Sequence, residues 1–189
     1  MTAIREQQDV VDLLVEQHNQ IKALFSRLGR ARGTEKRELF ESLVRLLAVH
    51  ESAEEIVVHP AAKRKTDRAE VVENRKQEED HAKRELAKLY DLGVDHPDFD
   101  TRLASFADAV MEHATREELE EFPVLRDNSS PEQLRRMAGA LQVAEATAPT
   151  RPHPHSGESA TANLIAGPPM AIFDRVRDAV RDWRESNRD

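Results

Sequence analysis

The feature that most constrains this chain is a pattern of histidine and glutamate that occurs twice. The segment HESAEEIVVHP, residues 50–60, aligns with HATREELEEFP, residues 113–123, so that a histidine and a glutamate four positions later coincide. A further histidine precedes each segment by 32 residues, and the two sets are 63 residues apart throughout. The repeated positions are His18, His50 and Glu54 in the first half and His81, His113 and Glu117 in the second. Any fold for this chain must explain why the pattern is repeated.

Apolar residues recur at steps of three and four in four long segments, which predicts four amphipathic helices. The predicted helices cover residues 7–28, 35–58, 67–92 and 100–124. Each carries one of the repeated histidines on its apolar side, and the two glutamates lie one turn after theirs on the same face. Charged residues make up 34% of the chain and aromatic residues 4%, which suits long exposed helices better than a β-sandwich. The sequence therefore predicts an all-α protein, an antiparallel up-down four-helix bundle.

Two additional helices are predicted at the C-terminal end. A short fifth helix begins at a capping-box sequence, Ser130 to Gln133, and completes a bundle domain at residues 1–146. Residues 147–169 are rich in Pro, Ala and Gly and are predicted to be a linker. Residues 170–189 are predicted to form a last amphipathic helix, with an apolar face of Phe173, Val176, Val180 and Trp183. This face either covers its own bundle or mediates binding to a protein partner or self-association.

Composition excludes or disfavours several classes of function. The chain has no cysteine, so disulfides, thiolate metal sites and a cysteine nucleophile are impossible. A net charge of −8 disfavours nucleic-acid binding. No apolar run reaches the roughly 18 residues of a membrane span, and no secretory signal is apparent, so no membrane role and a cytoplasmic location are expected.

Histidine and glutamate in a bundle core are costly unless their polar atoms are satisfied. A lone core histidine is more often hydrogen-bonded than bound to a metal. Chance alone, however, does not explain why all six polar residues recur on inward faces at the same spacing. Imidazole and carboxylate without thiolate favour iron, manganese or zinc over calcium. Four histidines and two glutamates exceed the needs of one ion, so we expect two ions, each held by two histidines and bridged by Glu54 and Glu117.

At these residues the sequence resembles the hemerythrin-like, or HHE cation-binding, family, over about residues 10–126. The family pattern is His, His-x-x-x-Glu, His and His-x-x-x-Glu on four successive helices. The resemblance implies an oxo- or hydroxo-bridged di-iron centre that meets dioxygen or related small molecules. It assigns His18 and His50 to one iron, His81 and His113 to the other, and the two glutamates as bridges.

One departure from the family bears on function. Oxygen-carrying hemerythrins have a further histidine one turn from the third-helix ligand, where this chain has Gln77 or Glu85. Glu85 is one candidate for a seventh ligand. Glu51 is the other, because some family members, including an iron-sensing ubiquitin-ligase subunit, use a glutamate directly after the second-helix histidine. His59 aligns with Phe122 and is predicted to be a helix-end residue rather than a ligand.

The missing ligand leaves positions open on both ions, which favours redox chemistry over reversible oxygen carriage. The functional hypothesis is a di-iron protein that binds or reduces dioxygen, peroxide or nitric oxide, with zinc or manganese as alternative metals. Whether it turns over as an enzyme is left open. The alternative is an iron- or oxygen-sensing interaction module without turnover.

Overall fold

The computed structural model describes residues 8–61, 69–147 and 169–186, and all regular structure in these ranges is helical. The prediction of an all-α fold is confirmed. The helices are α2 (Val10–Leu28), α3 (Gly33–Ala53), η1 (Glu54–Val58), α5 (Ala69–Leu92), α6 (Phe99–Arg116), η2 (Glu117–Glu121), α7 (Phe122–Asp127), α8 (Pro131–Thr147) and α10 (Pro169–Ser186). The segments η1 and η2 are π-helical turns that extend α3 and α6.

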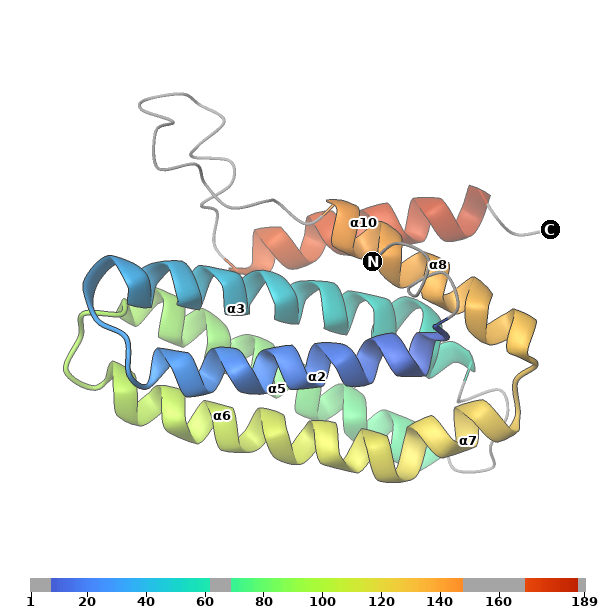
Figure 1. Cartoon of the computed structure of the whole chain (residues 1–189), viewed down its shortest axis with the longest axis horizontal. Helices are drawn as coiled ribbons and strands as arrows, with labels where there is room; N and C mark the ends of the chain where they lie inside the picture. Colours follow the sequence, from blue (N-terminus) through green and yellow to red (C-terminus); the bar gives the residue numbers. More distant parts are fainter. Residues whose placement is uncertain (1–7, 62–68, 148–168, 187–189) are drawn as a thin grey trace.

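Helices α2, α3, α5 and α6 lie side by side and alternate in direction along the long axis of the molecule (Figure 1). The α2–α3 and α5–α6 connections lie at the same end of the bundle. Gly93 ends α5 with a φ of 80° and donates its N–H to the Leu89 carbonyl, which is the left-handed C-terminal cap expected of glycine. Helix α3 begins at Gly33, two residues before the start at residue 35 that the sequence predicts.

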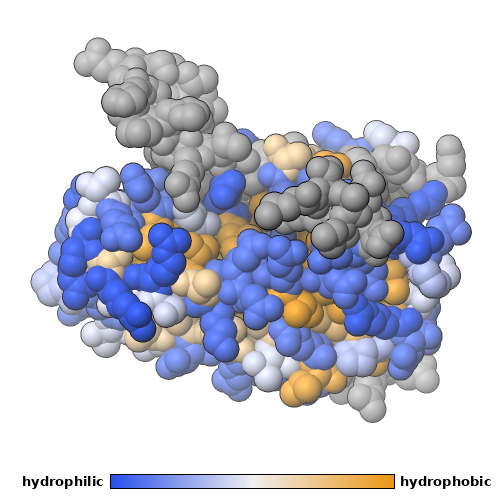
Figure 2. Space-filling model, viewed as in Figure 1, coloured by the Kyte–Doolittle hydropathy of each residue, from blue (hydrophilic) through white to orange (hydrophobic). Residues whose placement is uncertain are grey.

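Apolar side chains fill the bundle around a polar middle. Leu14, Leu43 and Leu86, from three different helices, are fully buried. Near the connected end, the rings of Phe40 and Phe99 pack edge to face with centroids 5.1 Å apart. Polar residues cover much of the face in Figure 2, with apolar patches between them. Of the described large hydrophobic residues, Leu119 is exposed, at 73%.

Helices α8 and α10 form a second layer over α3 (Figure 1). The predicted capping box of α8 is present, because Ser130 and Gln133 exchange backbone-to-side-chain hydrogen bonds of 3.0 and 3.2 Å. On α10, Phe173 and Val176 are buried, and the helix packs against α3, α8 and α5. This part of the apolar face therefore covers its own bundle. The predicted linker, residues 147–169, lies outside the described residues except for its two ends, which belong to α8 and α10.

Candidate metal centre

Each His-x-x-x-Glu motif lies where an α-helix widens into a π turn. His50 lies near the end of α3 and Glu54 begins η1, while His113 lies near the end of α6 and Glu117 begins η2. The i, i+4 spacing brings each histidine close to its own glutamate, with Nε2 to carboxylate oxygen distances of 3.4 Å in the first pair and 3.0 Å in the second. π turns within α-helices are frequent at functional sites. The repeat in the sequence is thus also a repeat in local structure.

Two overlapping groups of side chains meet in the middle of the bundle. The first group is His18, His50, Glu54 and Glu117, and the second is Glu54, Glu79, His113 and Glu117. All six residues of the two groups are buried, and in each group the candidate ligand atoms lie within 4.8 Å of one another. Glu54 and Glu117 belong to both groups. The arrangement therefore offers two adjacent ion positions that share two carboxylates.

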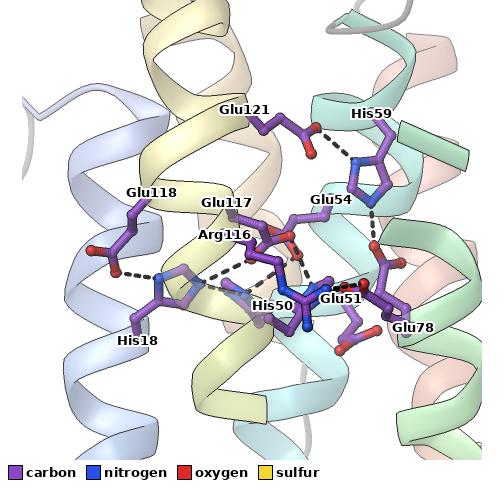
Figure 3. A network of polar contacts seen from close by, with 12 residues as sticks. His18, His50, Glu51, Glu54, His59, Glu78, Arg116, Glu117, Glu118 and Glu121 are labelled. Carbon is purple, nitrogen blue, oxygen red and sulfur yellow. Dashed lines mark hydrogen bonds and ion pairs between the residues drawn. The ribbon is translucent and has the colours of Figure 1, made fainter. Parts of the chain in front are cut away.

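The three histidines turn the same ring atom toward the shared carboxylates, as Figure 3 shows in part. His18 Nε2 lies 3.4 Å from Glu117 Oε2 and 3.1 Å from His50 Nε2. His113 Nε2 lies 3.0 Å from Glu117 Oε1. The Nε2 atoms of all three rings therefore lie beside Glu54 or Glu117.

The opposite ring nitrogens donate to oxygen atoms outside the centre. His18 Nδ1 donates to Glu118 Oε1 at 2.7 Å. His50 Nδ1 donates to Gln17 Oε1 at 3.0 Å. His113 Nδ1 donates to Glu78 Oε2 at 2.9 Å. Metal-binding histidines usually donate their other N–H to a carboxylate or carbonyl, which fixes the tautomer and the ring orientation. All three rings therefore have the orientation that a metal ligand requires.

The acceptors are themselves held in place. Gln17 Nε2 donates to Glu145 Oε1 on α8 at 3.1 Å, and Arg116 donates to Glu78 Oε1 at 2.6 Å. The first contact makes the fifth helix part of the support for His50, although α8 provides none of the side chains that meet at the centre. The second contact holds the carboxylate that orients His113.

A buried histidine outside the repeat, His59, links two further glutamates at the edge of the centre. Its Nε2 contacts Glu79 Oε1. Its Nδ1 donates to Glu121 Oε1 at 2.9 Å (Figure 3). Burial lowers the pKa of His59, but the hydrogen bonds with Glu121 and Glu79 outweigh burial and raise it to about 10. His59 is therefore an imidazolium that fixes the Glu79 carboxylate beside His113.

In the metal-free protein, the pKa values of the two shared carboxylates are shifted in opposite directions. Burial and the charges of Glu117 and Glu79 raise the pKa of Glu54 well above its ordinary value, so this carboxyl is neutral. Burial also acts on Glu117, but its contacts with His113 and His18 dominate and hold its pKa well below the usual range. Burial lowers the pKa of His50, so its ring is neutral. The site thus avoids two adjacent buried anions by keeping one of them protonated.

The donor atoms fit a cation. All four carboxylate oxygens of Glu54 and Glu117, and Nε2 of His113, are buried and make no hydrogen bond within the described part of the chain. Nitrogen atoms lie 3.0 to 3.4 Å from these oxygens without hydrogen-bond geometry. Buried polar atoms without partners are costly. A cation between the nitrogen and oxygen atoms satisfies both at once, and nitrogen with oxygen donors suits iron, manganese or zinc.

Comparison with known proteins decides the family. The model for the hemerythrin HHE cation-binding domain matches residues 9–125. The chain belongs to this family. It is a metal-binding, hemerythrin-like protein, and its buried His and Glu residues are the candidate ligands.

Two relatives and one solved structure resemble this hemerythrin-like chain. It is 23% identical over 177 residues to an uncharacterized hemerythrin-like protein of Schizosaccharomyces pombe, a match that covers 92% of this chain and 87% of that one. It is 28% identical over 145 residues to a DNA nickase of Nostoc sp., a match that covers 75% of this chain but 40% of the nickase. The crystal structure of a hemerythrin HHE cation-binding domain-containing protein, a homologue from Mycobacterium kansasii, superposes with a TM-score of 0.63. That match, at 21% identity over 71% of this chain and 83% of the other, shows a shared fold.

The structure brings five of the six repeated residues together and leaves out His81. The His81 side chain is exposed on α5 and lines a surface pocket, and Glu79 reaches the centre in its place. Successive residues of an α-helix are about 100° apart, so Glu79 and His81 face nearly opposite sides. The buried positions Glu79, Leu86 and Leu89 define the inner face of α5, and His81 is not on it. The expectation that His81 points into the centre is therefore corrected.

The two candidates for a seventh ligand have different surroundings. Glu85 is half-buried and accepts a hydrogen bond of 2.7 Å from Lys88, away from the centre. Glu51 is buried, and its Oε2 makes no hydrogen bond within the described residues. Lys83 lies 3.7 Å from Glu51, while burial and the charge of Glu79 raise the pKa of Glu51 to about 8. Glu51 thus lies beside the centre as a largely neutral acid, outside both four-residue groups.

Sequence reasoning missed Glu79, Gln17 and the network of His59 with Glu121. The 63-residue repeat offers no signal for them, because Gln17 aligns with Asp80 and Glu121 aligns with Val58. His59 is not only a helix-end residue. The run Glu78-Glu79 beside the expected ligand was a hint, since it places two carboxylates about 100° apart on the third helix.

Within residues 8–61, 69–147 and 169–186, no helix is both long enough and apolar enough to cross a bilayer.

Proposed function

We propose that this chain is a non-haem di-iron protein that binds or reduces dioxygen, peroxide or nitric oxide. The observation that carries the proposal is the pair of buried carboxylates, Glu54 and Glu117, shared by two adjacent groups of nitrogen and oxygen donors. Their oxygens have no hydrogen-bond partner among the described residues. A site of this composition suits a pair of transition-metal ions.

The proposed ligands follow from the two groups. In this assignment one ion is held by His18 and His50 and the other by His113 and Glu79, with Glu54 and Glu117 shared by both. Each ion then has four protein ligands, which leaves coordination positions for small molecules. Glu51 is proposed to lie next to the second ion without binding it, because it belongs to neither group.

When bound, a pair of iron ions supplies two electrons and open coordination positions for a small molecule. The protein's own residues supply the remainder. Glu54 gives up its proton when cations are present, because the cations replace the neighbouring negative charge as its main partner. Glu118, Gln17 and Glu78 hold the three rings in orientation. Burial of the centre, where Glu54 and Glu117 are 0% exposed, keeps bulk water away.

The test is metal analysis and an optical spectrum of protein purified without oxygen, followed by exposure to peroxide and to nitric oxide. We expect two irons per chain, charge-transfer bands after oxidation and reaction with at least one of these molecules. A single zinc ion per chain, or no reaction of the iron-loaded protein with either molecule, would contradict the proposal. Substitution of both shared glutamates by glutamine is expected to abolish the binding of both ions.

A second candidate is a metal-responsive module without turnover. Lys83 lies within 4 Å of Glu51 beside the centre and also 5.7 Å above the ring of Phe173 on α10. A change at the centre could thus reach the C-terminal helix through one lysine. Hydrogen exchange of the α10 amides, measured with and without iron, distinguishes the two functions. Iron-dependent protection of α10 favours the module if the protein also fails to consume peroxide and nitric oxide.

DNA cleavage is not part of the proposal, although one relative is a DNA nickase. This chain spans 40% of that protein. Its net charge of −8 disfavours the phosphate contacts that nucleic acid requires.

A further inference from the structure

A pocket of about 620 Å³ lies between α5 and α6, beside the candidate metal centre. Its inner end is formed by Glu51 and His113, and part of its wall is apolar, from Ala82, Phe106, Ala109 and Val110. Phe106 and Val110 are buried core residues. The exposed residues Thr101 and Arg102 also line it.

The pocket is far larger than the small molecules of the proposed function require. A water molecule in the liquid occupies about 30 Å³, so a volume of about 620 Å³ corresponds to roughly twenty times that. Dioxygen, hydrogen peroxide and nitric oxide have two heavy atoms each. Pockets of roughly 300–1,000 Å³ with apolar walls and a few polar groups typically bind organic molecules.

The pocket also has a direct connection with the chemistry. His113 lines the pocket and, through Nε2, lies 3.0 Å from Glu117 in the centre. On the side of His18 and His50, a cavity lined by residues of α2, α3 and α6 has a volume of only about 10 Å³. A molecule in the larger pocket can therefore place one end at His113 while its body contacts the apolar wall.

We propose that this pocket binds organic hydroperoxides, with the hydrocarbon part against Phe106 and Val110 and the peroxide group toward His113. The inference rests on the proposed function and names its substrate class. In the balanced reaction the O–O bond breaks, and the hydroperoxide takes up two electrons and two protons to give an alcohol and water. The electrons come from two ferrous ions, one from each, and the protons from solvent.

Binding can be measured without any reaction. The probe is 2-phenyl-2-propanol, the unreactive alcohol product of cumene hydroperoxide, added to the metal-free protein and followed by NMR. We expect shifts of resonances from α5 and α6 that saturate with ligand concentration. Absence of saturable binding would overturn the inference.

Two tryptophan substitutions on α6 supply the matched pair. Ala109→Trp fills the pocket, whereas Ala104→Trp places the same side chain at an exposed position of the same helix outside the lining. We expect Ala109→Trp to weaken binding of the alcohol by more than about tenfold, which is about 1.4 kcal/mol, and Ala104→Trp to leave it unchanged. Equal effects of the two variants would overturn the inference, and circular dichroism checks that both remain folded.

A kinetic comparison separates this inference from the proposed function. In iron-loaded protein, Ala109→Trp should lower the ratio of the cumene hydroperoxide rate to the hydrogen peroxide rate by about tenfold relative to Ala104→Trp. An unchanged ratio would overturn the assignment of the pocket while leaving peroxide reduction intact. Failure of wild-type protein to react with hydrogen peroxide or nitric oxide would instead contradict the proposed function, whatever the result for binding of the alcohol.

Discussion

The orientation of α5 determines which residue completes the centre, and a pair of substitutions tests it. Glu79 and His81 are two positions apart, or about 200° around the helix axis, so only one of them can face inward. Glu79 is 2% exposed and contacts His59, whereas His81 is exposed. We therefore compare Glu79→Gln, which removes a carboxylate, with His81→Gln, which removes an imidazole ring. Both substitutions introduce glutamine, a good helix former.

The expected magnitudes follow from burial. Glu79→Gln removes one partner of a buried ion pair, which typically costs about 3–5 kcal/mol of unfolding free energy. For a chain of this size that corresponds to a fall in Tm of roughly 6–20 °C. Substitution of exposed His81 should change the unfolding free energy by no more than about 0.5 kcal/mol. For metal affinity, even the loss of an outer hydrogen-bond partner costs about 10–100-fold, so loss of a ligand should cost at least that much.

The assays are urea denaturation of the metal-free proteins and metal content after dialysis against a weak chelator. We expect Glu79→Gln to be destabilised and to retain one ion per chain. His81→Gln should retain both ions and the stability of the wild-type protein. The opposite outcome, in which His81→Gln loses an ion and Glu79→Gln does not, would refute the reasoning. It would mean that α5 presents the face that the repeat in the sequence predicts.

Three further outcomes are expected. Gln17→Leu removes the acceptor of His50 Nδ1 and should weaken metal binding about 10–100-fold in a competition with a fluorescent chelator; an unchanged affinity would show that the ring is held without it. His59→Phe leaves Glu79 and Glu121 buried without their cation and should lower the unfolding free energy of the metal-free protein by about 3–5 kcal/mol in guanidinium titrations. A loss below about 1 kcal/mol would contradict a buried ion pair. Removal of residues 169–189 uncovers the surface on which Phe173 and Val176 are buried. It should increase the fluorescence of a bound hydrophobic dye and lower Tm in calorimetry; neither change would occur if α10 were not docked on the bundle.

The parts of the fold predicted correctly are those with a strong apolar period. Helices α2, α3 and α6 carry stripes of Leu, Val and Phe at steps of three and four, and the structure buries those stripes. The i, i+4 spacing of His50 with Glu54 and of His113 with Glu117 determines their relative positions on any helix. Their proximity therefore depended little on the details of packing.

Helix α5 could not be oriented from the sequence, because its first half is polar on nearly every side. Residues 77–81 read Gln-Glu-Glu-Asp-His, so no apolar stripe indicates the inner face there. The repeat then favoured His81, but tertiary packing of Leu86 and Leu89 turns Glu79 inward. Where local amphipathicity is weak, the more distant apolar contacts of the same helix decide its rotation.

The π turns were also beyond sequence reasoning, since the spacing of three and four assumes a regular α-helix. A π turn takes more residues per turn than an α turn, so η1 changes the direction in which the following residues point. As a result His59, five positions after Glu54, lies inward and contacts Glu79 and Glu121.

The unequal cavities on the two sides of the centre imply that its halves exchange ions at different rates, even though both derive from one repeated pattern. His113 lines the pocket of about 620 Å³, whereas His18 and His50 do not line it and instead adjoin a cavity of about 10 Å³. In the proposed two-ion centre, an ion that entered through this pocket would meet His113 before it reached His18 and His50. We expect the enclosed ion to be the last to leave under a chelator, so that partial depletion yields a protein with one metal in a defined place.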